Sequence, residues 1–159
     1  MPFTPLHLAA GWPVKVAVKD RFSLSAFVLM NLAIDIEPAL VMLFDLPMPL
    51  HGGCHTMLFV GIVMVILAIV HPPWIPWRAW LLGGLWGGVS HLILDAIMHT
   101  DVNLPFERTY PSVIHGLVPQ PALDGVCLAV SVACLYVLAQ RTGQHIRRKL
   151  RRDESGGTP

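Results

Sequence analysis

The sequence predicts an all-α integral membrane protein, a helical bundle that crosses the bilayer four or five times. Apolar residues fill 54% of the 159 positions and charged residues only 13%, whereas an ordinary soluble domain has about 25% charged residues. The mean hydropathy is +0.60. Between Thr56 and Met98, Arg78 and Asp95 are the only Asp, Glu, Lys or Arg residues. A soluble protein of this size could not cover so large an apolar surface.

Four apolar stretches are candidates for the spans, because a transmembrane helix needs about 20 predominantly apolar residues. They are residues 23–44, 56–71, 79–98 and 121–140. The second stretch is short, so we expect its helix to begin at His51. We predict a membrane-embedded domain over residues 1–140 and a basic cytoplasmic tail over residues 141–159.

Two local patterns support these boundaries. The third stretch contains GGLWGG, and such small residues let neighbouring membrane helices approach each other closely. The segment HPPWIPWRAW carries Trp74, Trp77 and Trp80, which is typical of a tight loop anchored at the membrane interface. The start of the chain is apolar before it is basic, the reverse of a cleavable signal peptide.

The distribution of basic residues predicts the orientation. Six Lys or Arg residues follow the fourth stretch, three precede the first, and Arg78 lies between the second and third. The connections 45–55 and 99–120 contain only Arg108. Cytoplasmic loops of membrane proteins are enriched in Lys and Arg. We therefore expect the tail on the inner side of a prokaryotic cytoplasmic membrane, and both of these connections outside.

Histidines and carboxylates gather in the predicted outer halves of three segments. In HLILDAIMHTD, His91, Asp95 and His99 are four residues apart and share one helical face. The motifs NLAIDIEP and PLHGGCHT supply the other members, and Asp101 follows the third segment. These other members are Asp35, Glu37, His51 and His55. Ionisable groups in membrane segments are costly and indicate a functional site.

Imidazole and carboxylate ligands are typical of zinc and of Mn- or Fe-type sites. The cluster exceeds the needs of one ion, and two ions about 4 Å apart polarise a phosphoryl or acyl oxygen and generate hydroxide. Asp35 and Glu37 would face different sides of an unbroken helix, but Pro38 loosens the turn before it. One carboxylate could then bind metal while the other serves as general base.

Two other functions remain open. The cluster could form the translocation site of a metal or proton transporter, or a structural metal site in a small scaffold protein. A transporter needs polar groups that continue to the opposite face, and LLGGLWGG below the cluster provides none. A structural zinc site is closed and has four ligands, so the larger cluster favours an enzyme.

The remaining polar residues are expected to have structural or surface roles. They are His71, His115, His145, Asp45, Asp124, Cys127 and Cys134. The cysteines form no C-x-x-C pair, although Cys54 lies between two histidines and is an alternative metal ligand. The net charge of +1 gives no indication of nucleic-acid binding, and we expect membrane lipids as the surroundings.

The motifs MPFTPLHLAAG, NLAIDIEP, PLHGGCHT and HLILDAIMHTD, in this order, resemble the YdjM-like family of membrane-bound, metal-dependent hydrolases. The resemblance covers most of residues 1–106. The order of ligands is also distantly similar to that of zinc-dependent phospholipase C. The chain departs from the family pattern at Ile34, where proline is frequent, and in HGGCHT, which lacks the arginine that often follows the first histidine.

This resemblance implies a hydrolase and gives no substrate. Taking the membrane setting and the cluster together, we expect a phosphoester or another lipid-like substrate. From the ligand types we expect one or two divalent transition-metal ions, with zinc the first choice, and Glu37 as the residue that activates water. The implied metal ligands are His7, Asp35, His51, His55, His91 and Asp95. His7 reaches an outer site only if residues 3–19 form a fifth membrane segment.

Overall fold

The computed structural model describes residues 7–48, 50–102 and 112–155. Over these residues the chain forms α-helices and short 3-10 helices (η) and no strand, so the all-α prediction is confirmed. The elements are η1 (Leu8–Ala10), α2 (Gly11–Val18), η2 (Lys19–Arg21), α3 (Leu24–Ile34), α4 (Ile36–Phe44), α5 (Met57–Ile69), α6 (Trp77–Met98) and α7 (Gln120–Ser155).

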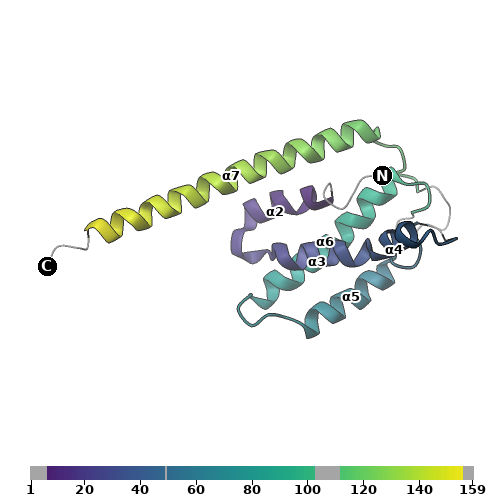
Figure 1. The fold of residues 1–159 in the computed structure, drawn as a ribbon, viewed down its shortest axis with the longest axis horizontal. Coiled ribbons are helices and arrows are strands. Elements are labelled where there is room, and N and C mark those ends of the chain that lie inside the picture. Colours follow the sequence, from purple (N-terminus) through teal and green to yellow (C-terminus); the bar gives the residue numbers. More distant parts are fainter. Residues whose placement is uncertain (1–6, 49, 103–111, 156–159) are drawn as a thin grey trace.

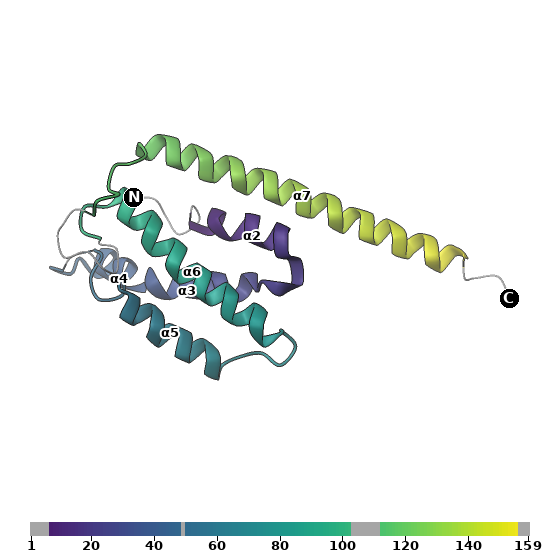
Figure 2. The ribbon, with the colours of Figure 1, turned by 180° about the vertical axis from the view of Figure 1, so that it is seen from behind.

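Three helices form the centre of the bundle, because α3, α5 and α6 all pack against one another. Helix α2 lies on α3 and α6, and α7 runs along α2 and η1 (Figure 1). Seen from behind, α7 continues well past the bundle in the direction of the C-terminus (Figure 2). The helix thus crosses the predicted boundary at position 140 without a break.

The number of candidate spans is smaller than predicted. Within the described residues, Trp77–Met98 and the Gln120–Val137 part of α7 are long and apolar enough to cross a membrane. The bent pair α3 and α4 is a third candidate if it counts as one span. Helix α5 has 13 residues, which rise only about 20 Å at 1.5 Å per residue. The described residues therefore contain two or three candidate membrane spans, whereas the sequence predicted four or five.

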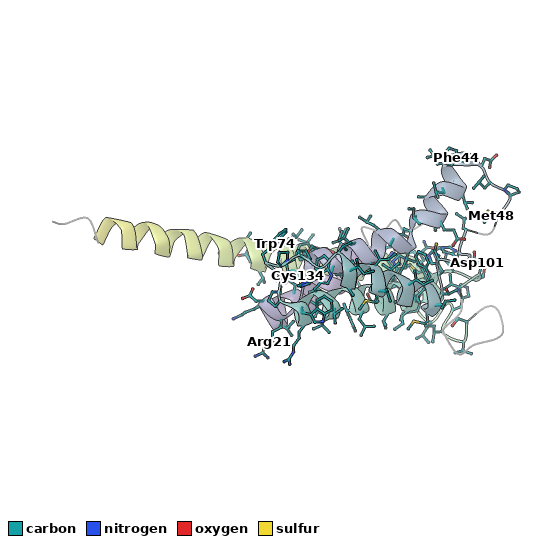
Figure 3. All side chains as sticks on the ribbon, turned by 90° about the horizontal axis from the view of Figure 1, so that it is seen from below. Arg21, Phe44, Met48, Trp74, Asp101 and Cys134 are labelled. Atoms are coloured by element: carbon teal, nitrogen blue, oxygen red, sulfur yellow. The ribbon has the colours of Figure 1, made fainter. Side chains whose placement is uncertain are left out.

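The first predicted span is broken at Asp35, where α3 ends and α4 begins with a bend of 40°. Pro38 explains the break, because its nitrogen has no hydrogen to donate to the carbonyl of Ile34 four residues earlier. Figure 3 shows the result: α4 leaves the bundle, with Phe44 at its far end. The break gives Asp35 and Glu37 different surroundings.

The second predicted span begins later than expected. The prediction of a start at His51 is wrong, because residues 51–56 form turns and the helix begins at Met57. Gly52 and Gly53 favour a turn over a helix. Thr56 then caps α5, since its hydroxyl oxygen accepts a hydrogen bond from the Phe59 N–H at 3.2 Å. The two histidines of this segment therefore lie in a loop.

The glycines of GGLWGG allow α6 to touch two neighbours at once, as predicted. Gly83 and Gly87 face α3, where a Cβ on Gly87 would lie 2.9 Å from the carbonyl oxygen of Phe27. Gly84 and Gly88 face α5, where a Cβ on Gly88 would lie 2.5 Å from a methyl group of Val60. Side chains at these positions would separate the helices, so glycine determines how closely the three central helices approach.

The bundle has two chemically different ends. Figure 3 places Arg21 and Trp74 toward one end, and Asp101 and Met48 at the other. Between the ends lies a buried apolar core from α3, α5 and α6. It consists of Ala26, Met30, Ile34, Val60, Val63, Leu67, Trp80 and Leu92. The basic end and the predicted metal ligands are therefore separated by close-packed apolar side chains.

We expect Gly87→Ala to destabilise the protein by about 1–3 kcal/mol, because overpacking a closely fitted contact costs energy of that order. The added methyl group would press on the backbone carbonyl of Phe27, which cannot rotate away. Unfolding in detergent micelles measures the effect. Gly61→Ala on α5 is the matched control, since nothing lies within 4 Å of its Cβ position. Equal stability of the two variants would contradict this account of the helix contact.

Candidate metal centre

The structure brings all six predicted metal ligands to the end of the bundle opposite the basic residues. They come from the N-terminal segment, the α3–α4 break, the loop before α5 and the last turns of α6. The residues are His7, Asp35, His51, His55, His91 and Asp95, and His99 and Asp101 adjoin them. His7 was predicted as a ligand only from the family resemblance, and it lies within hydrogen-bond distance of Asp95.

The carboxylate of Asp95 is the centre of this cluster and is 2% exposed. His7 Nε2 lies 2.9 Å from Oδ1, and the Nε2 atoms of His55 and His91 each lie 3.1 Å from Oδ2. His99 Nε2 is more distant, at 3.9 Å from Oδ1. The three nearest imidazoles come from three separate segments. One buried carboxylate thus connects the whole cluster.

Two of these close approaches are not hydrogen bonds. Among the described residues, His55 Nε2, His91 Nε2 and Asp95 Oδ2 are buried and have no hydrogen-bond partner of acceptable geometry. Imidazole lone pairs and a carboxylate oxygen repel one another unless a cation lies between them. A metal ion can satisfy converging buried imidazole nitrogens and carboxylate oxygens that have no other partner. The geometry of the cluster could therefore hold a metal ion.

Asn31 determines which nitrogen of His91 is available. Asn31 Nδ2 donates to the Phe27 carbonyl at 2.8 Å, which leaves its Oδ1 to accept from His91 Nδ1 at 2.9 Å. Nδ1 of His91 therefore carries a proton, and in the neutral ring Nε2 has its lone pair toward Asp35 and Asp95. Hydrogen bonds of this kind orient metal-binding histidines and fix their tautomer. Asn31 and His91 are both 0% exposed.

His51 is oriented in a similar way by Asp101. His51 Nδ1 lies 2.9 Å and 3.0 Å from the two Asp101 oxygens, so Nδ1 donates and Nε2 keeps its lone pair. Burial raises the pKa of Asp101, but the hydrogen bond and charge of His51, a backbone hydrogen bond and the charge of His99 together outweigh it, so the pKa lies below its usual value. Burial and the nearby His51 ring lower the pKa of His99. A neutral His99 is the form that binds metal.

Three sets of side chains place a donor atom from each residue within 4.8 Å of the others. The first set is His7, Asp35 and His91, the second is His51, His55 and Asp95, and the third is His51, His99 and Asp101. The first two sets contain the six predicted ligands and no other residue. The second and third sets share His51, and Asp95 of the second set contacts His7 and His91 of the first, so the cluster could hold more than one ion.

Glu37 has different partners from the other predicted site residues. Its Oε1 accepts from the Gly53 N–H at 3.1 Å, and its Oε2 accepts from the Cys54 N–H at 2.8 Å. It belongs to none of the three ligand sets found among the described residues. The predicted role as general base stays a prediction, and the engagement of both oxygens disfavours it.

The residues expected to be structural lie outside the three ligand sets where the structure describes their side chains, and the side chain of His145 lies outside that part of the chain. His71 Nε2 donates to the Ile75 carbonyl at 2.8 Å, and Asp45 ends α4 in the left-handed region with φ 48°. Cys54 is a free thiol, and burial followed by the charge of Glu37 raises its pKa. It belongs to no ligand set among the described residues. A raised pKa disfavours the thiolate that zinc requires.

Sequence reasoning missed the residues that orient the ligands. Asn31 precedes Asp35 by four residues, which puts both on one helical face, but an asparagine in an apolar helix is by itself a weak signal. Asp101 was recognised as part of the cluster, yet its pairing with His51 joins residues 50 apart in sequence. Only the folded chain brings such partners together.

No family model, curated protein or solved structure matches this chain. The resemblance to the YdjM-like family therefore stays a prediction from four short motifs.

We expect Asn31→Ala to weaken zinc binding about 10- to 100-fold, because losing the hydrogen bond that orients a ligand has an effect of that size. Competition with a chromogenic chelator measures the affinity. Ser90→Ala is the control, since Ser90 is also buried and adjoins His91, but its hydroxyl donates to the Trp86 carbonyl. Melting of the metal-free proteins separates affinity from stability. An unchanged affinity in Asn31→Ala would show that Asn31 does not orient His91.

Proposed function

We propose that this protein is a membrane-bound, metal-dependent hydrolase with one or two zinc ions at the buried cluster. The observation that carries this proposal is the single buried carboxylate of Asp95 with three imidazole nitrogens within 3.1 Å. When bound there, the metal would supply a Lewis acid and lower the pKa of water. The proposed ligands are those predicted from the sequence: His7, Asp35, His51, His55, His91 and Asp95.

The side chains of the protein would hold and orient the reacting groups. Asn31 fixes the tautomer of His91, and Asp101 fixes that of His51. His7 and His91 stack with ring centroids 4.2 Å apart and an interplanar angle of 11°, so their positions depend on each other. Because His55, His91 and Asp95 are buried, bulk water is excluded from the inner part of the cluster. A preorganised site of this kind is costly to build and favours a catalytic role.

A lipid-like substrate with a phosphoester fits the position of the cluster. The 11 residues of α3 rise about 16 Å from the basic end to the site, and the hydrocarbon core of a bilayer is about 30 Å thick. The site would therefore lie below the outer membrane surface. Leu40, Leu43 and Phe44 on α4 are exposed next to it. An apolar exposed helix beside a polar site favours lateral access from the bilayer.

We propose an orientation in the cytoplasmic membrane with the C-terminus inside. The end of the bundle beyond which the basic tail extends also carries Lys15, Arg21 and Arg78. Cytoplasmic surfaces of membrane proteins are enriched in Lys and Arg. Four or five segments would cross or enter the bilayer if the shorter α5 and α2 are counted. A cysteine in place of the exposed Val113 tests the orientation, and labelling only after permeabilisation would reverse it.

Metal or proton transport is the second candidate, because it would use the same buried histidines and carboxylates. A transporter needs a polar path to the opposite face. Directly beyond the cluster lie Met30, Ile34, Val60 and Leu92, all buried and apolar. This apolar floor favours the hydrolase.

The test is hydrolysis by zinc-loaded protein of bis(p-nitrophenyl) phosphate and of phospholipid in mixed micelles. We expect release of product that stops with a chelator and returns with zinc. Asp95→Asn should lower the rate about 100-fold, because losing a ligand typically has an effect of that order. Asp20→Asn, an exposed carboxylate outside the ligand sets, should keep the full rate.

No hydrolysis of either substrate by protein that retains its zinc would contradict the proposed activity. Zinc flux into proteoliposomes by the same preparation would then favour transport. Activity that survives complete removal of metal would contradict the role of the cluster.

A further inference from the structure

We propose that Glu37 is a positioning residue that holds the loop carrying His51 and His55 at the metal centre. This inference rests on the proposed function, since it concerns two of the proposed ligands. Glu37 lies at the start of α4, and the loop lies just before α5. The contact therefore joins the bent end of the first candidate span to the segment that supplies two imidazoles.

The contact uses both oxygens of the carboxylate. Oε1 accepts from Gly53 N–H at 3.1 Å, and Oε2 accepts from Cys54 N–H at 2.8 Å. Hydrogen bonds to an ionised acceptor are about twice as strong as neutral ones. The two donors lie between His51 and His55 in the chain, so the carboxylate holds the middle of the ligand loop.

The other side of the loop is held by its own backbone and by Thr56. The His55 N–H donates to the Gly52 carbonyl at 3.2 Å, and the Thr56 hydroxyl donates to the Gly53 carbonyl at 2.9 Å. Thr56 in turn caps α5. The N–H groups at positions 53 and 54 are not used by these contacts. Glu37 satisfies them, and the loop becomes one rigid unit attached to both α4 and α5.

Gly52 allows the carboxylate to approach this closely. A Cβ at position 52 would collide with the Glu37 carboxylate. By contrast, a Cβ at Gly53 would meet nothing within 4 Å. The contact with Glu37 therefore requires glycine at position 52 but not at position 53.

The break in the first span separates the tasks of the two neighbouring carboxylates. Asp35, at the break, joins His7 and His91 in a ligand set, whereas Glu37, one residue into α4, turns to the loop. A displacement of about 1 Å in a catalytic group can lower a rate 100-fold, so the position of the loop matters to the site. Glu37 acts on the metal centre through the two histidines.

The experiment compares zinc affinity in Glu37→Gln, Glu37→Ala and wild-type protein by chelator competition. A glutamine keeps one acceptor but turns its NH₂ group toward the second backbone N–H, so we expect about tenfold weaker binding. Alanine removes both acceptors, and we expect about 100-fold weaker binding, as for loss of other residues that orient ligands. Asp45→Asn is the control, because it makes the same change at the exposed end of α4.

Gly52→Ala and Gly53→Ala form a second matched pair. The first should weaken zinc binding as Glu37→Ala does, and the second should not, because only position 52 collides with the carboxylate. The metal-free variants should melt close to metal-free wild type. At saturating zinc, the variants with weakened zinc binding should hydrolyse bis(p-nitrophenyl) phosphate at a rate close to that of the wild type and with the wild-type pH profile.

The outcomes separate this inference from the function on which it rests. Unchanged zinc affinity with a rate that stays low at saturating zinc would make Glu37 the general base and overturn the positioning role. Unchanged affinity and unchanged rate would overturn both roles of Glu37 while leaving the metal centre intact. Wild-type protein without affinity for zinc would overturn the metal centre itself, and the positioning role with it.

Discussion

The buried carboxylate of Asp95 is the constraint on which the rest of the structure depends. A carboxylate removed from water costs several kcal/mol unless charges and hydrogen bonds compensate it. Here the compensation comes from His7, His55 and His91, which arrive from three segments far apart in the chain. Because two of the three close approaches lack hydrogen-bond geometry, protons alone satisfy the cluster poorly. A bound cation could complete it.

The arrangement follows from irregularities in otherwise apolar helices. Pro38 breaks the first candidate span at Asp35, which directs one carboxylate to the cluster and the next to the loop with His51 and His55. Gly83 and Gly87 on α6 bring α3 close enough for Asn31 to reach His91. Below the cluster, close-packed apolar side chains separate it from the basic end. Each irregularity costs helix stability locally and positions one part of the site.

The sequence predicted which histidines and carboxylates lie together better than it predicted the helices. The four-residue spacing of His91 and Asp95 predicted that they share one helical face. The distribution of basic residues predicted the orientation of the segments, and with it that His91 and Asp95 lie on the same side as His51 and His55. The predicted helix boundaries were wrong where a local contact determines the start of a helix. Thr56, for example, caps α5, so the helix begins after His51 and His55. The orienting contacts of Asn31, and of Glu37 with a loop 16 residues away, depend on tertiary structure. No spacing rule along the chain reveals them.

The most direct test is X-ray absorption spectroscopy of protein purified without chelators. The account predicts a transition-metal edge, with zinc the first choice, and one to two ions per chain. The ligand shell should contain nitrogen and oxygen at about 2.0–2.1 Å with imidazole scattering. A sulfur shell at about 2.3 Å would instead indicate a thiolate ligand such as Cys54. That result, or protein that contains no metal, would contradict the assignment of the histidine and aspartate cluster as the metal centre.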